Sequence, residues 1–172
     1  MEFIQKGWYV IYTKSRHEKK VFEDLMLRKC TAYLPLVNHL SQWSDRRKWI
    51  EKPLFSSYVF VYLSDVASYY KVLPVDGFVT FINFGGKMAI VKDVEIETIK
   101  ELIANCKEVE LVQSDIKIGE RRKVSFGPLS GYGGEVVQYK GKDRIIVRIE
   151  SLRQDIMAEV PVECLAGENM FW

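Results

Sequence analysis

The sequence has few of the residues that mark secreted, metal-binding or membrane-spanning proteins. Its three cysteines, Cys30, Cys106 and Cys164, are far apart and odd in number. This pattern argues against a disulfide framework and favours a reducing compartment. No apolar run approaches the roughly 20 residues that a membrane-spanning helix needs, and the N-terminus has no signal-peptide pattern. We therefore expect a soluble, cytoplasmic, monomeric protein without membrane contact.

Residues of the kind that build active sites are also scarce. The two histidines are His17 and His39, and no pair of Cys or His residues has the short spacing of a zinc site. Gly131, Gly133 and Gly134 fit neither common phosphate-binding glycine motif and lead into a predicted strand, so they offer no helix N-terminus to a phosphate. We expect no catalytic residues, no metal, no cofactor and no enzymatic activity.

The net charge of +2 is too small for wholesale coating of nucleic acid, but its distribution is uneven. Residues 1–52 carry a net charge of +5, residues 53–113 carry −3, and residues 114–172 are balanced. The positive field is therefore local. A local basic surface can steer an anionic partner.

Residues 1–107 show the pattern of a mixed α/β domain. Trp8–Tyr12 is a compact apolar run typical of a buried strand, and the spacing of Ser15 and Glu18 predicts a capping box for a helix over residues 16–29. Ser64 or Asp65 is expected to cap a short second helix, and Asp93 a third. Further strands are expected at residues 32–36, 58–63, 78–84 and 88–91, with a polar hairpin or arm over 38–52. Gly85-Gly86 is a plausible hairpin turn. The order predicts an α+β layer structure with a mostly antiparallel sheet.

Residues 108–114 lack a clear pattern and are interpreted as a linker to a second module, residues 115–172. Strands are expected there at residues 124–126, 134–139, 145–149 and 157–160. Ile145, Val147 and Ile149 alternate with Ile146 and Arg148, so one face should be buried. Short strands with glycine-containing turns, above all the segment Gly127–Gly134, predict a small closed β-barrel.

Two surface features could carry a binding function. The segment Lys52–Leu63 is aromatic on both strand parities, which indicates either that helices cover both faces or that Phe55, Tyr58 and Tyr12 line an apolar depression for a partner helix. Cations and tryptophans mix between Trp43 and Trp49, which is typical either of a solvated hairpin tip or of a surface that binds phosphates and stacks bases. The cations of this cluster are Arg46, Arg47 and Lys48. A second basic group, Lys14, Arg16, Lys19 and Lys20, is either an exposed helical face or a further nucleic-acid contact.

In their order along the chain, these motifs resemble NusG-type transcription elongation factors. The first module resembles their N-terminal (NGN) domain: Trp8-Tyr9-Val10 opening a strand, a helix, Pro35, then Pro53-Leu54-Phe55 and Tyr58-Val59-Phe60-Val61. The second resembles the KOW domain, an SH3-like β-barrel, in Gly119–Val124, Gly127–Gly131 and Gly134–Val137. Each motif alone is weak, whereas their co-linear order over nearly the whole chain is specific.

The resemblance implies a factor that binds bacterial RNA polymerase. In the family, an apolar depression on the N-terminal domain grips the clamp helices of the β′ subunit. By position it includes Tyr12, Phe55 and Tyr58, with Trp8 behind it and Ile99 at its edge. Bridging the polymerase cleft favours the pause-resistant enzyme.

Three further contacts follow from the same resemblance. A contact to the gate loop of the β subunit corresponds to Ser68, Tyr69, Tyr70 and Lys71. The basic group at Lys14, Arg16, Lys19 and Lys20 corresponds to the surface that approaches the non-template DNA strand. A loop of the KOW domain that binds Rho or ribosomal protein S10 corresponds to Ser151, Leu152 and Arg153.

Departures from the family pattern decide between a general and a specialised factor. Ser56-Ser57 replaces a common Pro-Gly or Pro-Asn turn, residues 68–71 lack a threonine-rich character, and residues 151–153 are only loosely similar, so Rho binding is not carried over. The amino-acid sequence of residues 53–61 is closer to that of operon-specific paralogues of the RfaH type. We therefore expect an antitermination factor that suppresses pausing and premature termination on specific operons.

Two alternatives stay open at the level of the sequence. One is a general elongation and termination factor of the same family, which binds Rho or ribosomal protein S10. The other is a free-standing RNA-binding protein that uses Trp43, Arg46, Arg47 and Trp49 on nascent or free RNA. The second alternative predicts tight, strongly salt-dependent RNA binding without polymerase.

Overall fold

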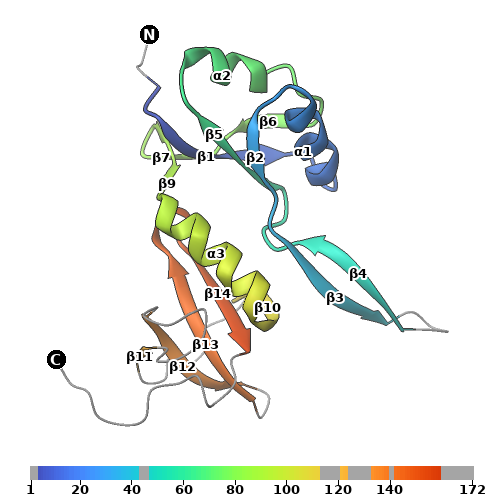
Figure 1. Cartoon of the computed structure of the whole chain (residues 1–172), viewed down its shortest axis with the longest axis vertical. Coiled ribbons are helices and arrows are strands. Elements are labelled where there is room, and N and C mark those ends of the chain that lie inside the picture. Colours follow the sequence, from blue (N-terminus) through green and yellow to red (C-terminus); the bar gives the residue numbers. More distant parts are fainter. Residues whose placement is uncertain (1–3, 43–46, 113–120, 124–132, 140–141, 160–172) are drawn as a thin grey trace. The chain divides into compact units, whose positions relative to one another are not determined.

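The structure, a computed structural model, describes residues 4–42, 47–112, 121–123, 133–139 and 142–159 (Figure 1). The chain divides into two compact units, residues 1–97 and residues 98–172. In the described residues, no helix combines the length and the apolar character needed to cross a bilayer.

An antiparallel sheet forms the centre of the first unit. Its order is β2-β5-β1-β6, and a short strand, β9, pairs with the N-terminal half of β1. Strand β1 pairs with β5 along its length, so Trp8 lies opposite Tyr62 and Tyr12 opposite Tyr58. The strands of this sheet are β1 (Gly7–Thr13), β2 (Thr31–Tyr33), β5 (Tyr58–Leu63), β6 (Phe78–Phe81) and β9 (Ile90–Val91).

Two helices contribute to the core on one face of this sheet. They are α1 (Glu18–Leu27) and α2 (Val66–Val72). Val21 and Leu25 of α1 and Val72 of α2 are fully buried in one cluster with sheet residues of a single strand parity. Those sheet residues are Tyr9, Ile11, Val59, Val61, Leu63 and Phe81. The prediction of a mixed α/β fold with antiparallel sheets is thus confirmed.

The predicted polar arm is a two-stranded ribbon. Strand β3 (Leu36–Gln42) pairs with β4 (Arg47–Pro53), and neither strand pairs with any other described strand. A second hairpin joins β7 (Asn83–Phe84) to β8 (Lys87–Met88) through Gly85-Gly86. Both glycines have positive φ, 60° and 79°, which glycine adopts without steric cost and a two-residue hairpin of this type requires. The predicted turn is confirmed, and the run predicted over 78–84 is two strands.

The start of α1 differs from the prediction. Ser15 does not cap the helix, because Arg16 has a left-handed backbone (φ 61°) that turns the chain before the first helical residue. The helix begins at Glu18, after an N-cap residue, His17, whose side chain makes no capping bond. Glu18 is buried, and its Oε1 accepts a 2.7 Å hydrogen bond from the backbone N–H of Ser57. The predicted capping box was wrong, and its glutamate instead binds the turn before β5.

Replacing Glu18 with alanine should destabilise the first unit by about 1–3 kcal/mol, because the N–H of Ser57 then loses its acceptor. Chemical denaturation followed by circular dichroism measures this change. Glu23→Ala, an exposed position on the same helix, is the matched control and should change stability by less than about 0.5 kcal/mol. Equal stability of the two variants would contradict a structural role for the bond.

The other two helices begin close to their predicted caps. Asp65 caps α2 with a full capping box: its carboxylate accepts from the N–H of Ser68 at 2.7 Å, and Ser68 Oγ accepts from the N–H of Asp65 at 3.2 Å. Helix α3 spans Asp93–Asn105, so Asp93 is its first residue rather than its cap. There, the Glu95 carboxylate accepts from the N–H of Lys92 at 3.0 Å.

The described part of the second unit is a five-stranded antiparallel sheet of order β10-β14-β13-β12-β11. Ile145 and Ile149 are buried and Arg148 is exposed, as the alternation predicts. Among the described residues no pairing joins the two outer strands, so the predicted closed barrel is not seen there. Residues 124–126 and 127–132 lie outside the described residues. The strands are β10 (Lys107–Leu111), β11 (Arg121–Lys123), β12 (Gly133–Tyr139), β13 (Lys142–Ile149) and β14 (Gln154–Glu159).

Residues 108–111 of the expected linker form strand β10, which pairs with β14. Glu108 has a left-handed backbone (φ 48°) in the stretch between Lys107 and Glu110 where the register shifts. The guanidinium of Arg144 on β13, only 4% exposed, binds the carboxylates of Glu108 and Glu110, the latter at 2.8 Å. This segment therefore belongs to the second sheet through both its backbone and its side chains.

Candidate functional site

A row of aromatic residues lies on the sheet face of the first unit opposite the helical core. Strand parity puts Trp8, Val10 and Tyr12 on this face, and the β1–β5 register sets Tyr62, Phe60 and Tyr58 opposite them. Strand β2 adds Tyr33, opposite Phe60, and the turn before β5 adds Phe55. We call this group the aromatic face. Its members are Trp8, Tyr12, Tyr33, Phe55, Tyr58, Phe60 and Tyr62.

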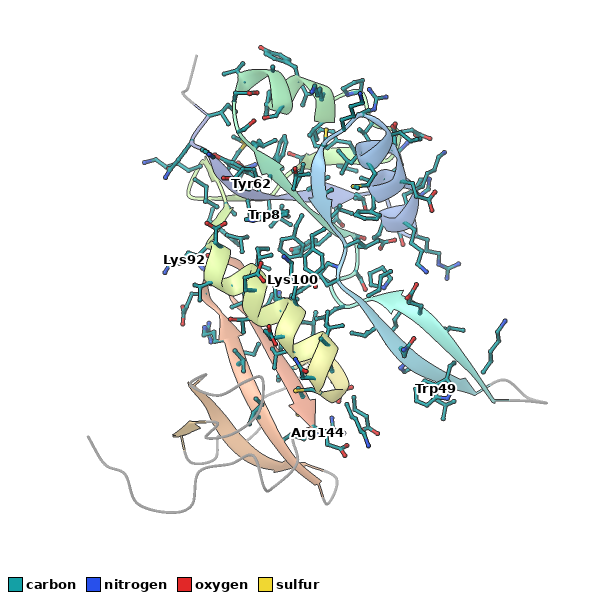
Figure 2. All side chains as sticks on the ribbon, in the orientation of Figure 1. Trp8, Trp49, Tyr62, Lys92, Lys100 and Arg144 are labelled. Carbon is teal, nitrogen blue, oxygen red and sulfur yellow. The ribbon has the colours of Figure 1, made fainter. Side chains whose placement is uncertain are left out.

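Five of the seven rings of the aromatic face contact one another in a series, which Tyr33 ends at 6.1 Å from Phe60. Tyr12 meets Tyr58 edge-on at 6.2 Å between centroids, and Tyr58 stacks on Phe55 at 6.5 Å. Phe55 in turn meets Phe60 edge-on at 5.6 Å. Trp8 and Tyr62 form a separate pair at 5.5 Å, visible side by side in Figure 2. Such contacts add about 0.5–1.5 kcal/mol each beyond burial and fix the ring orientations.

Burial divides the aromatic face into a closed centre and an accessible end. Val10 and Phe60 are fully buried, and Phe55 is 2% exposed. Tyr12 is 41% exposed, and Trp8 and Tyr58 are half-buried. The residues of the predicted depression in this unit, Trp8, Tyr12, Phe55 and Tyr58, thus share one face. Phe55 lies in the packed interior of the aromatic face, whereas the side chain of Tyr12 is accessible to solvent.

The turn between β4 and β5 sets the position of Tyr58. The N–H of Tyr58 donates to the carbonyl of Phe55 at 3.2 Å, and the N–H of Thr13 donates to the carbonyl of Ser57 at 2.8 Å. Ser57 has a positive φ of 62°, a backbone region that favours glycine. Serine at this position keeps the turn through these bonds and through its own N–H, which donates to the Glu18 carboxylate.

Ile99, predicted at the edge of the depression, lies on α3. The side chain is fully buried in α3, and the residue belongs to the second compact unit. This position was predicted from the resemblance alone.

Tyr33, Phe60 and Tyr62 were missed as members of the aromatic face. Burial, and less strongly the negative charge of Glu97, raises the pKa of Tyr33 to about 12, so its hydroxyl stays neutral at physiological pH. Strand parity in residues 58–63 was the available signal, because Phe60 and Tyr62 alternate with core valines. Their long-range pairing with Tyr33 and Trp8 was not visible in the sequence.

The four residues predicted to contact the gate loop have different environments. Ser68 belongs to the capping box of α2, and Tyr69 stacks on Phe81 at 5.3 Å. Tyr70 is 54% exposed and Lys71 is exposed. Ser68 and Tyr69 therefore stabilise the fold, whereas Tyr70 and Lys71 are accessible to a partner.

The basic group at α1 is largely neutralised by nearby carboxylates. Lys20 binds Asp76 at 2.6 Å, Lys14 lies 3.9 Å from the same carboxylate, and Lys19 binds Glu51 at 3.0 Å. The ammonium of Lys20 holds the pKa of Asp76 below its usual range, so the carboxylate stays charged. Arg16 is exposed. The local positive field is weaker than the sequence count indicates.

The ribbon of β3 and β4 carries the second predicted basic cluster. Trp43 and Arg46 lie outside the described residues, and Arg47 pairs in backbone register with Gln42. Lys48 is exposed, and Trp49 is 64% exposed opposite Leu40. Trp49 is thus a solvent-facing indole rather than an anchor on the body.

The loop predicted to bind a partner in the second unit joins β13 to β14. A short 3₁₀ helix, η1 (Glu150–Leu152), occupies it, and Arg153 follows with a left-handed backbone (φ 53°). Leu152 is 4% exposed, Ser151 is half-buried and Arg153 is exposed. In the part of the chain that the structure describes, no group of three His, Cys, Asp or Glu side chains could hold a metal ion.

Comparisons with known proteins agree with this architecture. The family model described as transcription termination factor nusG matches residues 6–100, more than half of the chain. The transcription termination/antitermination protein NusG of Lactococcus lactis is 25% identical over 158 residues, 84% of each chain. The protein of the same name from Streptococcus pyogenes serotype M3 is 26% identical over 180 residues, 96% of this chain and 98% of the relative.

A solved structure of Thermotoga maritima NusG has a similar fold. Its TM-score is 0.58, with 22% identity over 96% of this chain and 98% of that one. Together these matches define a class, the bacterial transcription termination and antitermination factors. The chain belongs to the NusG family. Proteins of this family are transcription factors rather than known enzymes, act in the cytoplasm and generally interact with RNA polymerase.

Proposed function

We propose that this protein is an elongation and antitermination factor that binds RNA polymerase through the accessible end of the aromatic face. The partner is a helical element of the polymerase, the clamp helices of the β′ subunit. Binding suppresses pausing and premature termination. The single observation that carries the proposal is the Tyr12–Tyr58 pair, in which Tyr12 is 41% exposed and Tyr58 is half-buried beside the buried ring of Phe55.

The geometry of this pair suits an apolar helix. A partly exposed aromatic pair on a rigid sheet gives contact area at little cost in conformational entropy, which is the usual character of interface anchors. Phe55 stacks under Tyr58 and limits its movement. The two hydroxyl groups are free to bond polar groups at the rim, since no hydrogen bond within the described residues uses them.

A specialised role on particular operons is the finer part of the proposal. The amino-acid sequence of residues 53–61 supports it, and so does the loop after β13. Leu152 is buried and Arg153 exposed, so this loop presents no pair of apolar side chains to Rho or ribosomal protein S10. The alternative, a general factor that binds Rho or ribosomal protein S10, requires Ser151 and Arg153 to make that contact without Leu152.

The test is co-purification of the full-length protein with core RNA polymerase. Tyr12→Asp combined with Tyr58→Asp should weaken binding by at least roughly 30-fold, since interface anchors contribute about 2 kcal/mol or more. Leu27→Asp is the matched control: Leu27 is 83% exposed on α1, away from the aromatic face, and should bind normally. Polymerase that lacks the clamp helices should fail to bind the unchanged protein.

Unchanged binding by the double tyrosine variant would overturn the proposal. A pull-down with Rho separates the specialised factor, which should not bind Rho, from the general one. Transcription in vitro over a terminator then measures function: the unchanged protein should raise read-through, and the double variant should not.

A second candidate function, RNA binding by the ribbon, has one observation in its favour. Trp49 is 64% exposed next to the exposed Lys48, and an exposed indole beside a cation is suited to stack on an unpaired base. The contact to non-template DNA at Lys14, Arg16, Lys19 and Lys20 has less support, because three of these cations have carboxylate partners. Tyr70 and Lys71 are the residues that best suit a gate-loop contact.

A further inference from the structure

A cavity of about 350 Å³ lies in the first unit, apart from the aromatic series Tyr12–Tyr58–Phe55. It is lined by the residues around the end of α1, the start of β1 and the start of α2. Three lysines belong to its wall: Lys6 before β1, Lys29 after α1 and Lys71 in the last turn of α2. The volume is in the range of ligand sites, and the lining points to a charged rather than an apolar ligand.

These three lysines differ from the lysines at and near α1 in forming no ion pair with a described residue, although the charge of Lys71 contributes weakly to lowering the pKa of Asp65. No ion pair joins Lys6, Lys29 or Lys71 to a carboxylate in the part of the chain that is described. The lysines at positions 14, 19 and 20 all have such partners. The positive charge at this cavity is therefore not offset by ion pairs as it is at Lys14, Lys19 and Lys20.

One carboxylate, that of Asp65, also lines the cavity. This carboxylate already accepts two hydrogen bonds from neighbouring residues. It accepts from the N–H of Ser68 at 2.7 Å and from Ser64 Oγ at 3.1 Å. The bond from Ser68 lowers the pKa of Asp65, so it stays ionised and the wall has three positive charges against one negative. Burial raises the pKa of the Cys30 thiol, also in the wall, so it stays neutral and adds no negative charge.

Neutral donors complete the lining. Thr31 and Tyr62 are neighbours across the β2–β5 pairing, and both contribute to the wall. Neither hydroxyl has a hydrogen-bond partner in the described structure. Ammonium groups together with hydroxyl donors are the set that binds phosphate oxygens, whereas a cation would find only the occupied carboxylate.

We propose that this cavity binds a phosphate group, held by Lys6, Lys29 and Lys71 with the hydroxyls of Thr31 and Tyr62. Two sources have the required chemistry: the backbone of a nucleic-acid strand and a free phosphate compound. The site is separate from the Tyr12–Tyr58 pair, although it includes Lys71, which also suits the gate-loop contact.

The test uses the full-length protein without polymerase, and pyrophosphate and a short oligothymidylate as probes. Amide NMR resonances of residues 29–31 and 64–71 should shift with a phosphate probe. Lys29→Gln combined with Lys71→Gln should weaken binding about tenfold and lower the slope of log K against log salt by about one per lysine. Lys19→Gln is the matched control, because that lysine is exposed and already paired with Glu51.

The two probes distinguish the sources. Shifts with both probes, and tighter binding of the oligothymidylate, identify a nucleic-acid backbone. Shifts with pyrophosphate alone identify a free phosphate compound. The proposal is overturned if neither probe shifts these resonances, or if the double lysine variant binds as the unchanged protein does. Trp49→Ala in the same titration reveals binding at the ribbon instead, which would also count against the cavity. The substituted side chains, Lys19, Lys29, Lys71 and Trp49, are all exposed. Thermal unfolding should therefore show that the variants fold.

Discussion

Replacing Phe55 with alanine should lower the free energy of unfolding of the first unit by about 3–5 kcal/mol, the usual cost of removing a buried phenylalanine. The ring is 2% exposed, stacks on Tyr58 and meets Phe60 edge-on, so truncation removes contacts on two sides. Typical domains have only about 5–15 kcal/mol of stability. Hydrogen exchange of β5, followed by mass spectrometry, should therefore accelerate strongly.

The matched control for Phe55 is Val79→Ala. Val79 lies on the same sheet and is 50% exposed, so its truncation should cost less than about 0.5 kcal/mol. A Phe55→Ala protein as stable as this control would contradict the packing described here. The prediction also bears on function: loss of polymerase binding in Phe55→Ala would not separate a lost contact from a lost fold, and the tyrosines at positions 12 and 58 are the better probes.

Replacing Glu108 and Glu110 together with glutamine should destabilise the second unit by about 2–4 kcal/mol. The guanidinium of Arg144 is 4% exposed and would keep its charge while losing the two carboxylates that bind it. Breaking one side of a buried ion pair usually costs more than this, but both carboxylates are half exposed and water screens them. Chemical denaturation of the full-length protein measures the change.

Arg144→Met is the informative comparison. It removes the buried charge and leaves two carboxylates that water can solvate, so stability should change by less than about 1 kcal/mol. The double glutamine variant should therefore lose more stability than Arg144→Met does. The opposite order would show that the arginine stabilises the sheet mainly by packing rather than by charge. Arg148→Met, at a 53% exposed side chain on the same strand, controls for the methionine itself.

Short-range patterns predicted much of the fold. The alternation at β13, the apolar run of β5, the Gly85-Gly86 turn and the cap at Asp65 all act within a few residues, so the sequence contains them directly. Strand β10 was missed because its Val109 and Leu111 give only one alternation. Its strand character depends on pairing with residues near Met157, far along the chain. The error at Ser15 has a similar origin, since Glu18 is used by Ser57 rather than by its own helix.

The candidate site was predicted in part for the same reason. Tyr12, Phe55 and Tyr58 were found from the aromatic strand and the resemblance, but the sequence did not separate the buried Phe55 from the exposed Tyr12. Exposure depends on the register between strands and on the turn at Ser57. Charge counts were limited in another way: they placed the positive field in residues 1–52 but did not show that Asp76, far along the chain, binds Lys20.

Strand β10 also determines where the protein can be cut. A fragment that starts at residue 115, the boundary that composition indicates, would lack β10 and leave one backbone edge of β14 unpaired. An open strand edge of this kind promotes association between molecules. The same cut would separate Arg144 from Glu108 and Glu110. An isolated C-terminal fragment should therefore retain residues 107–111, and aggregation of a shorter one would reflect the missing strand rather than an inability of the module to fold.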